Sequence, residues 1–195
     1  MKEMWDARYL DQKYVYGKAP NAFFKDKIKD LTKGKILLPA EGEGRNAVYA
    51  AGLGWDVSAF DFSDQARVKA LDLARENNLK IEYKVHDIEG ADYEKDAFDM
   101  LALVYAHNSN RKDNHRRLLK FLKPGGMLLI EAFSKAQIEL NTGGPKSIDM
   151  LFSVEDLKDD FSELTELKVW EEQIDLNEGE FHKGQSAVIR LFGIK

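Results

Sequence analysis

Cysteine, a long apolar run and a dense basic cluster are all missing from this sequence. Because none of the 195 residues is cysteine, disulfide bonds and thiolate chemistry are excluded, as is common in cytoplasmic proteins. No apolar run approaches the length of a membrane span, and the opening residues MKEMWDARYL have no signal-peptide core. The four histidines are scattered without metal-ligand spacing. These absences predict a cytoplasmic protein with no metal site and no membrane partner.

Charge and chain length further limit the class of protein and the number of domains. The chain carries 29 basic and 34 acidic residues, a net charge of −5, and its basic residues concentrate only at 111–112 and 116–117 on one predicted helix. Nucleic-acid binding depends on neutralising phosphates, so this balance argues against a nucleic-acid partner. With 195 residues and 44% hydrophobic content, the chain is long enough for one sizeable core and short for two. We therefore expect a single domain spanning 1–195.

Strand and helix patterns alternate through the first two thirds of the chain. Such alternation predicts right-handed crossovers and a mainly parallel sheet covered on both faces. The predicted strands are residues 36–39, 57–61, 81–86, 98–105 and 126–133, and the predicted helices between them are 45–51, 64–77 and 112–122. The sequence Lys123-Pro124-Gly125-Gly126 is expected to end the third helix.

The pattern changes after the fifth predicted strand. Residues 134–147 are polar and predict a long loop, and residues 153–156 resemble a capping box that opens a short helix. Two final runs, 164–176 and 186–192, flank residues 177–180 and predict an antiparallel hairpin. The first 34 residues are rich in aromatic side chains, so we expect one or two helices there, packed over the ligand edge of the sheet.

The most informative segment is KILLPAEGEGRNA at residues 35–47. An apolar run leads into a turn that fits the G-x-G-x-x-G/A pattern from Gly42, and Asp61 ends the next predicted strand about 20 residues further on. Glycines let a backbone approach a ligand, and an acidic residue at that spacing can hold a ribose diol. A ligand-free turn, a nicotinamide dinucleotide site and an S-adenosylmethionine site are all compatible with this pattern.

The charge of the turn indicates which of the two cofactors it suits better. A dinucleotide places its pyrophosphate on the N-terminus of the helix, where free amides favour an anion. Glu41 and Glu43 stand in that turn, so they would repel a pyrophosphate and occupy the amides it needs. S-adenosylmethionine has a ribose and an adenine but no phosphate, and its methionine end carries a sulfonium and an ammonium. The acidic turn therefore favours the methyl donor.

Several segments together give the chain its resemblance to a known family. They are WDARY at 5–9, YGKAPN at 16–21, PAEGEGRN at 39–46, AFD at 59–61, LKPGG at 122–126 and the closing hairpin. With these the chain resembles a class I S-adenosylmethionine-dependent methyltransferase over nearly its whole length, most closely the small bacterial tellurite-resistance and thiopurine methyltransferases. One departure is that Leu38 and Ala40 stand where the usual first motif has an acidic residue and a glycine.

The resemblance implies a fold, a division of the chain and a donor site. The implied fold is α/β, a Rossmann-like doubly wound sheet of seven strands, mostly parallel with the last strand antiparallel. Residues 1–34 would form an N-terminal helical cap, 35–133 the donor-binding core, and 134–195 the acceptor-side loop, helix and hairpin. The implied donor-binding residues, which hold S-adenosylmethionine across the strand ends, are Tyr16, Pro20, Asn21, Glu41, Gly42, Gly44, Arg45, Asp61, Phe62, Asp87, Ile88, Leu103 and Tyr105.

The acceptor side is less clearly marked in the sequence. Methyl transfer from a sulfonium is an in-line displacement that depends mainly on positioning, so no fixed catalytic triad is expected. His107 follows the fourth predicted strand and is the candidate catalytic residue. His182 could enter the same pocket, although a solvated surface position is the favoured interpretation; His86 is expected to be structural and His115 to be exposed.

These observations lead to one principal hypothesis and two alternatives. The principal one is methyl transfer from S-adenosylmethionine to a small-molecule acceptor. The alternatives are a nicotinamide-dependent oxidoreductase and a non-catalytic module that binds S-adenosylmethionine. The sequence selects neither the acceptor nor an oligomeric state.

Overall fold

A seven-stranded sheet forms the centre of the computed structural model, which describes residues 2–11, 13–140, 142–179 and 181–195. The strand order is β3-β2-β1-β4-β5-β7-β6. The strands are β1 (Lys35–Pro39), β2 (Asp56–Asp61), β3 (Glu82–Val85), β4 (Phe98–Val104), β5 (Leu122–Phe133), β6 (Glu166–Asn177) and β7 (Lys183–Ile194). β1 to β5 pair in parallel, and β7 lies antiparallel between β5 and β6. The predicted Rossmann-like sheet is confirmed.

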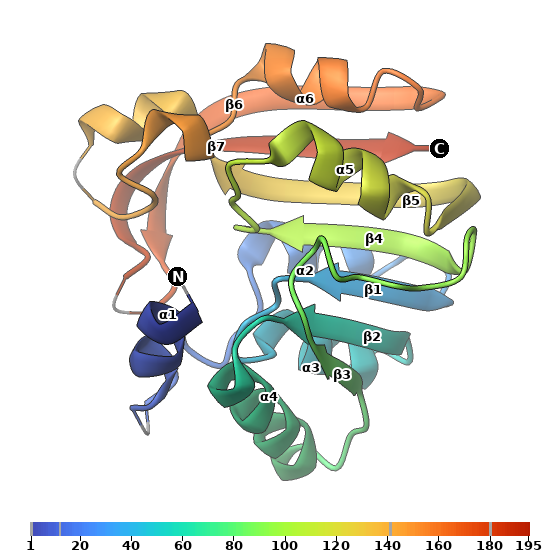
Figure 1. The fold of residues 1–195 in the computed structure, drawn as a ribbon, viewed down its shortest axis with the longest axis vertical. Coiled ribbons are helices and arrows are strands. Elements are labelled where there is room, and N and C mark those ends of the chain that lie inside the picture. The colour runs from blue at the N-terminus through green and yellow to red at the C-terminus, as the bar shows by residue number, and fades with distance from the viewer. Residues whose placement is uncertain (1, 12, 141, 180) are drawn as a thin grey trace.

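Helices cover both faces of this sheet, as Figure 1 shows, with α5 and α6 in front and α2 and α3 behind. The helices are α1 (Lys2–Tyr9), α2 (Ala22–Ile28), α3 (Arg45–Gly52), α4 (Asp64–Glu76), α5 (Arg111–Leu119) and α6 (Val154–Asp160), with short 3-10 helices η1 (Lys135–Glu139) and η2 (Ile148–Met150). Side-chain caps begin three of them: Asn21 accepts from the amide of Phe24, Ser63 from that of Ala66, and Ser153 forms the predicted capping box with Asp156.

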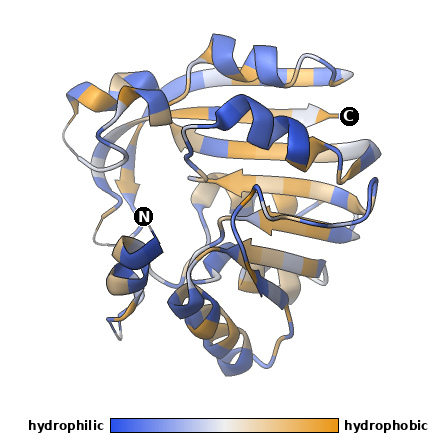
Figure 2. Cartoon of the chain, in the orientation of Figure 1, coloured by the Kyte–Doolittle hydropathy of each residue, from blue (hydrophilic) through white to orange (hydrophobic). Residues whose placement is uncertain are grey.

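Alternation along the strands divides the core between the two faces. Leu37, Leu101 and Leu103 pack towards α5 and α6, whereas Ile36, Leu38 and Met100 pack towards α2 and α3. Because both faces are covered, the central strands read as almost continuous apolar runs. Figure 2 shows this distribution, with the hydrophobic colour concentrated in the sheet and α5 largely hydrophilic on its outer side.

Two predicted boundaries near β4 and β5 are wrong, for local reasons. β4 ends at Val104 because Tyr105 turns into the left-handed region with φ +55°. The third predicted helix ends at Leu119, and the Lys-Pro-Gly-Gly sequence lies inside β5 instead of ending that helix. Gly125 has φ +75° and its amide bonds to the carbonyl of Lys195 at 2.7 Å, beside a shift in the β4–β5 register. The proline and glycines thus form an irregular strand entrance.

The environment of α5 differs from the prediction. His115 is fully buried, with Nδ1 2.7 Å from Oδ2 of Asp160, and Arg111 pairs with the same carboxylate. The expected exposure of His115 is therefore wrong, and the Asp160 side chain is buried with it. Both side chains lie at the interface of α5 and α6, which a one-dimensional charge pattern does not reveal.

The remaining predicted segments are placed as follows. α1 and α2 are the expected N-terminal helices, and the hairpin is formed by β6 and β7, although Glu180 in its turn lies outside the described residues. The predicted loop 134–147 contains η1, and Asn141 within it is likewise not described. The division into cap, core and acceptor side stays a prediction.

Candidate functional site

A cavity of about 710 Å³ opens at the carboxyl ends of β1, β2, β4 and β5, under α1 and the tip of the β6–β7 hairpin. Figure 1 shows α1 and the bent end of this hairpin on the side to which β4 points. Open α/β sheets bind ligands at this edge, where the strand order reverses. The cavity is lined by Met4, Trp5, Arg8, Tyr9, Tyr16, Gly17, Ala40, Glu41, Gly42, Glu43, Arg45, Asn46, Asp61, Phe62, Val104, Tyr105, Ala106, His107, Phe133, Gly143, Gly144, Pro145, Lys146, Met150, Phe181 and His182.

Glu41 occupies the N-terminus of α3 from the turn after β1. Its Oε1 accepts the amides of Asn46 and Ala47, both at 2.7 Å, and its Oε2 accepts from Nδ2 of Asn46 at 3.3 Å. Burial raises the pKa of Glu41 to about 7, and these hydrogen bonds oppose the rise. Two of the amides that could hold a pyrophosphate, those of Asn46 and Ala47, are therefore already bonded to a carboxylate, in agreement with the charge argument from the sequence.

Asp61 lies at the end of β2, beside the same turn. Its Oδ2 accepts the amide of Gly42 at 3.2 Å and its Oδ1 accepts the amide of Ser63 at 2.9 Å. Burial raises the pKa of Asp61 to about 6, against these hydrogen bonds. Each carboxylate oxygen can accept a further hydrogen bond, so Asp61 has capacity for a ligand diol in the cavity that it lines with Phe62.

The two glycines of the turn are required by packing as well as by any ligand. Gly42 has φ +62°, and a Cβ there would stand 2.9 Å from the hydroxyl of Tyr9. Gly44 has φ +86°, and a Cβ there would stand 2.6 Å from Cβ of Ala70 on α4. Gly44 therefore allows α3 and α4 to approach one another, a role that the motif alone does not distinguish from ligand contact.

Glu43 and Arg45 hold the N-terminal strap, which we define as residues 13–21, against the turn. Oε2 of Glu43 accepts the amides of Val15 at 2.8 Å and Tyr16 at 3.3 Å, and Oε1 pairs with Lys69. Arg45 donates to the carbonyl of Tyr16 at 3.2 Å. The strap is thus fixed over the cavity by charged side chains of the loop, so the acidic turn has a structural role in addition to its electrostatic one.

The strap is also bonded to the hairpin tip. Arg45 pairs with Oε2 of Glu178 at 2.8 Å, and both side chains are largely buried. Oε1 of Glu178 accepts from Nδ2 of Asn21 at 3.0 Å and from the amide of Ala22 at 3.2 Å. Two segments more than 130 positions apart in the sequence therefore close one side of the cavity together.

A buried carboxylate on β5 completes this network. Glu131 is fully buried; its Oε1 accepts from Nδ2 of Asn21 at 2.5 Å and from the hydroxyl of Tyr105 at 2.8 Å, and its Oε2 pairs with Nε of Arg190 at 2.6 Å. Arg190 also pairs with Glu172. Sequence reasoning missed Glu131, although a single acidic residue inside the apolar run 127–133 was a usable signal.

His107 lies at the other end of the cavity and is held by two hydrogen bonds. The amide of Phe133 donates to Nε2 at 3.1 Å, so Nδ1 carries the hydrogen and donates it to the carbonyl of Met150 at 2.7 Å. Burial lowers the pKa of His107 to about 4. The ring is neutral with both nitrogens bonded to the protein, and its catalytic role stays a prediction.

His182 contradicts the solvated position favoured by the sequence. Its side chain is 7% exposed and lines the cavity against the rings of Tyr16, Tyr105 and Phe133. Burial lowers the pKa of His182 to about 3, and Arg45 adds to the effect. The hairpin tip bends over the strand ends, and this bend brings a residue of an apparently exposed turn into the site.

The predicted donor residues fall into two groups. Those that line the cavity are Tyr16, Glu41, Gly42, Arg45, Asp61, Phe62 and Tyr105. Those outside its lining are Pro20, Asn21, Gly44, Asp87, Ile88 and Leu103. Of the latter, Leu103 and Ile88 lie in the core, and Asp87 is exposed and accepts the amide of Gly90 at 2.7 Å. No ligand contact of either group is tested, so their donor roles stay predictions.

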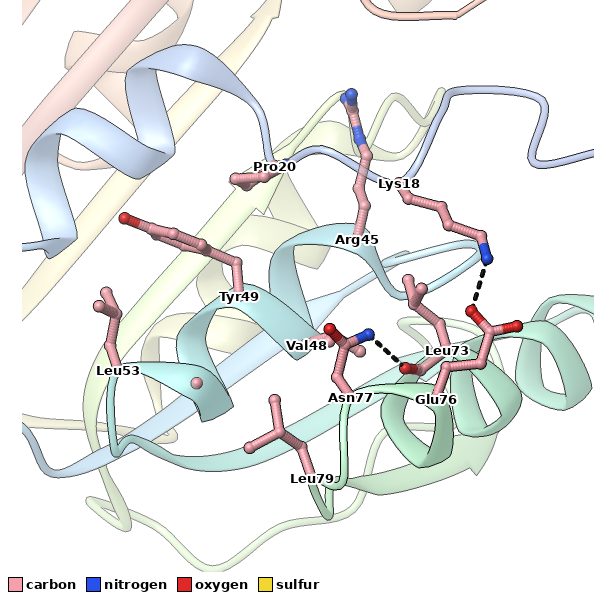
Figure 3. A pocket seen from close by; sticks show the side chains of 11 residues that line it. Lys18, Pro20, Arg45, Val48, Tyr49, Leu53, Leu73, Glu76, Asn77 and Leu79 are labelled. Carbon is pink, nitrogen blue, oxygen red and sulfur yellow. Dashed lines mark hydrogen bonds and ion pairs between the residues drawn. The ribbon is translucent and has the colours of Figure 1, made fainter.

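A second, shallower cavity of about 560 Å³ lies on the outer side of α3 and α4 (Figure 3). Pro20 lines this cavity instead of the first, and Arg45 lines both. Lys18 and Glu76 form an ion pair at 2.5 Å beside it, with both side chains about half exposed. This hollow is separate from the strand ends.

Two further features of the described residues bear on function. Within 2–11, 13–140, 142–179 and 181–195, no helix has the length and apolar character needed to cross a membrane. The same residues contain no group of three or more potential metal ligands close enough to share an ion.

Comparison with known proteins agrees with the geometry. A family model described as a methyltransferase domain matches residues 36–126, a little under half of the chain. Two curated relatives carry the name ubiquinone biosynthesis O-methyltransferase. The relative from Rickettsia conorii is 31% identical over 118 residues, which are 60% of this chain and 40% of the relative. The relative from Rickettsia akari is 31% identical over 111 residues, which are 56% of this chain and 44% of the relative. The aligned region thus spans less than half of these relatives.

Solved structures share the fold over the whole chain. One of them has a TM-score of 0.79 at 21% identity, and the match covers 100% of this chain and 92% of that chain. Its structure was reported for the conversion of a disulfide bond into a thioacetal group during echinomycin biosynthesis. TehB from Haemophilus influenzae has a TM-score of 0.70 at 18% identity, and the match covers 100% of this chain and 66% of TehB. A possible histamine N-methyltransferase from Thermotoga maritima has a TM-score of 0.69 at 17% identity, and the match covers 100% of both chains. Residues 36–126 therefore match a methyltransferase domain, and the whole chain shares the fold of these solved structures.

Proposed function

We propose that this protein transfers a methyl group from S-adenosylmethionine to a small-molecule acceptor. The observation that carries the proposal is the carboxylate of Glu41 on the amides of α3, with Asp61 beside it in the same cavity. A phosphate would find the amides of Asn46 and Ala47 already bonded to Glu41, whereas a ligand with a diol and a cationic end finds complementary carboxylates. The match of residues 36–126 to a methyltransferase domain supports the same donor.

The donor would lie across the ends of β1 and β2. In this placement Asp61 accepts hydrogen bonds from the ribose hydroxyls, Phe62 packs on the adenine, and the turn at Glu41 and Gly42 faces the methionine end. The sulfonium then points towards Tyr105 and the acceptor end of the cavity. Each of these contacts is proposed from the cavity lining and from the resemblance of the motifs.

Positioning supplies most of the rate in such a site. Methyl transfer needs the acceptor atom, the methyl carbon and the sulfur in line, and a closed pocket holds them there without competing water. Here α1, the strap and the hairpin tip cover the strand ends; Asn21 of the strap bonds Glu178 of the tip, and Arg45 of α3 contacts both segments. His107 fixes the wall between Phe133 and Met150 through both ring nitrogens, so it would act by shaping the pocket.

The acceptor end favours a small, flat molecule. Tyr105, Phe133, Phe181 and the two histidine rings line it, and aromatic rings bind planar groups by stacking and edge contacts. The relatives named ubiquinone biosynthesis O-methyltransferase agree with a hydroxyl as acceptor, and the predicted resemblance to the tellurite-resistance group makes a metalloid oxyanion the other class to test. A cytoplasmic location and the absence of a nucleic-acid partner also remain predictions.

Donor affinity should fall in mild acid. Ribose hydroxyls donate to ionised Asp61, whose pKa in the free protein is about 6, and the methionine ammonium favours ionised Glu41, whose pKa is about 7. Affinity is therefore greatest about one pH unit or more above 7 and is lost as the pH falls through these two pKa values. We expect the Kd of S-adenosylhomocysteine to rise about tenfold or more between pH 7.5 and pH 5. Calorimetry at each pH measures this, and a flat profile over that range would contradict it.

Turnover is tested by incubating the protein with methyl-labelled S-adenosylmethionine and a panel of phenols, thiols, amines and metalloid oxyanions. Labelled product with one class supports the enzyme and names its acceptor. Binding of S-adenosylhomocysteine with no product from any class would favour the non-catalytic binding module. A fluorescence titration with reduced nicotinamide dinucleotide tests the remaining alternative, and saturable binding there would contradict the proposal.

A further inference from the structure

Three aromatic side chains hold the guanidinium of Arg8 at the wall of the cavity. Arg8 lies in the last turn of α1, beside the bent end of the β6–β7 hairpin (Figure 1). Its guanidinium carbon lies 4.5 Å from the ring centroid of Trp5 and 4.7 Å from that of Phe181, and Nη1 donates to the hydroxyl of Tyr16 at 3.0 Å. All four side chains line the cavity, so α1, the strap and the hairpin tip together place this cation there.

The same guanidinium has unused hydrogen-bonding capacity. The bond to Tyr16 takes one of its five N–H donors. Within residues 2–11, 13–140, 142–179 and 181–195, Arg8 pairs with no carboxylate, and the nearest acidic residue of its own helix, Asp6, bonds to Lys2 and Ser63 instead. Aromatic packing fixes the plane of a guanidinium and leaves its edge free to donate. A carboxylate matches that edge with two parallel hydrogen bonds.

Charge is divided between the two ends of the cavity. The acidic side chains that line it, Glu41, Glu43 and Asp61, belong to the turn after β1 and the end of β2, where the donor is proposed to lie. Among the described residues, no acidic side chain lines the acceptor end, to which Phe181 belongs. The acceptor end therefore has the cation of Arg8 without a carboxylate, and it favours an anionic group over an ammonium.

The donor also has an anionic group, the carboxylate of its methionine end. In the proposed placement that end faces the turn at Glu41 and Gly42. Arg45 is the first residue of α3, directly after this turn, and lines the cavity there. Arg8 packs instead on Phe181, at the acceptor end. This separation favours the acceptor as the ligand of Arg8.

We infer that Arg8 selects a methyl acceptor that carries a carboxylate, which it binds as an ion pair at the wall of the cavity. The inference rests on the proposed methyl transfer. The carboxylate is distinct from the atom that receives the methyl group. Holding the carboxylate orients the molecule, so that the receiving atom can face Tyr105 and the sulfonium. Removing the charge of Arg8 should therefore weaken binding of the anion and spare an uncharged analogue.

The test uses protein saturated with S-adenosylhomocysteine and compares the ortho, meta and para hydroxybenzoates with the corresponding hydroxybenzamides. The members of each pair differ in charge and hardly in shape. In calorimetry at pH 7.5, we expect wild-type protein to bind at least one hydroxybenzoate about tenfold or more tightly than its amide. Arg8→Gln should abolish this preference and leave the affinity for the amide within about twofold. Arg8→Lys keeps the charge without the planar donor edge and should retain part of the preference.

A matched control removes the same charge elsewhere. Arg75 lies on α4 outside the cavity lining, with its side chain 77% exposed, so Arg75→Gln should keep the preference. Wild-type protein that binds no hydroxybenzoate better than its amide would overturn the acceptor class. A preference that survives in Arg8→Gln would overturn the role of Arg8.

A second titration separates the acceptor from the donor. It compares S-adenosylhomocysteine with 5′-methylthioadenosine, which lacks the amino-acid end. Arg8→Gln should bind each within about twofold of wild type, and this also shows that the variant is folded. A loss of affinity for S-adenosylhomocysteine alone would assign Arg8 to the donor carboxylate and overturn the inference. Failure of wild-type protein to bind S-adenosylhomocysteine would instead overturn the proposed function.

Discussion

Replacing Arg190 by methionine should lower the free energy of unfolding by about 3–5 kcal/mol. Arg190 is the cation paired with the fully buried Glu131, with Nε 2.6 Å from Oε2. Removing one partner of a buried pair leaves the other charge desolvated without compensation, and this costs more than the pair itself contributes. Methionine keeps much of the side-chain length, so the effect reports mainly the lost charge. Urea unfolding followed by circular dichroism measures it.

Two controls separate the buried charge from general damage. The double variant Glu131→Gln with Arg190→Met removes the uncompensated carboxylate and should recover most of the lost stability. Arg75→Met on α4 breaks an ion pair with Asp72 in which the Arg75 side chain is 77% exposed and that of Asp72 46%, and it should cost only about 0–1 kcal/mol. A loss below about 1 kcal/mol for Arg190→Met would show that Glu131 does not depend on this partner.

Replacing Asp61 by alanine should weaken binding of S-adenosylhomocysteine by about 1–3 kcal/mol, roughly 5- to 150-fold in Kd. The carboxylate is the proposed acceptor for both ribose hydroxyls, and hydrogen bonds to a charged group are the stronger kind. The variant also frees the amides of Gly42 and Ser63, which Asp61 now accepts at 3.2 and 2.9 Å. Calorimetric titration gives the Kd, and thermal unfolding shows whether the turn remains folded.

A control for Asp61 lies on the same strand. Asp56 begins β2 at the opposite end and is exposed, so Asp56→Ala should leave the Kd unchanged. Asp61→Asn keeps the shape of the side chain and should give a smaller loss together with a weaker pH dependence between pH 5 and 7.5. Unchanged affinity in Asp61→Ala would remove this residue from the donor site.

The sheet and its helices could be predicted because two signals agree along residues 35–133. The spacing of apolar residues indicates each strand or helix, and capping and turn residues mark where it begins or ends. Apolar runs of strand length alternate with helical stripes, and Ser63 and Ser153 mark the starts of α4 and α6. The predicted fold is confirmed, and the comparisons support the predicted enzyme class and donor. Where boundaries failed, as at Tyr105 and Gly125, a left-handed backbone or an irregular register ended the pattern locally.

The wall of the site could be predicted only in part because it is assembled from distant segments. Glu41 and Asp61 lie in one local motif, so their proximity follows from the chain itself. Glu131 and His182 reach the site through the pairing of β5 with β7 and the bend of the hairpin tip, which depend on tertiary packing. The strap likewise owes its place to Glu43, whose contacts span 27 and 28 positions of sequence.

The central claim is that this cavity binds a phosphate-free adenosyl donor. Calorimetric titration of the folded wild-type protein at pH 7.5 with S-adenosylhomocysteine, and separately with reduced nicotinamide dinucleotide, tests it most directly. We expect saturable binding of S-adenosylhomocysteine at one site per chain and none of the dinucleotide. Absence of heat with S-adenosylhomocysteine at high micromolar concentration, in a sample shown to be folded, would contradict the claim.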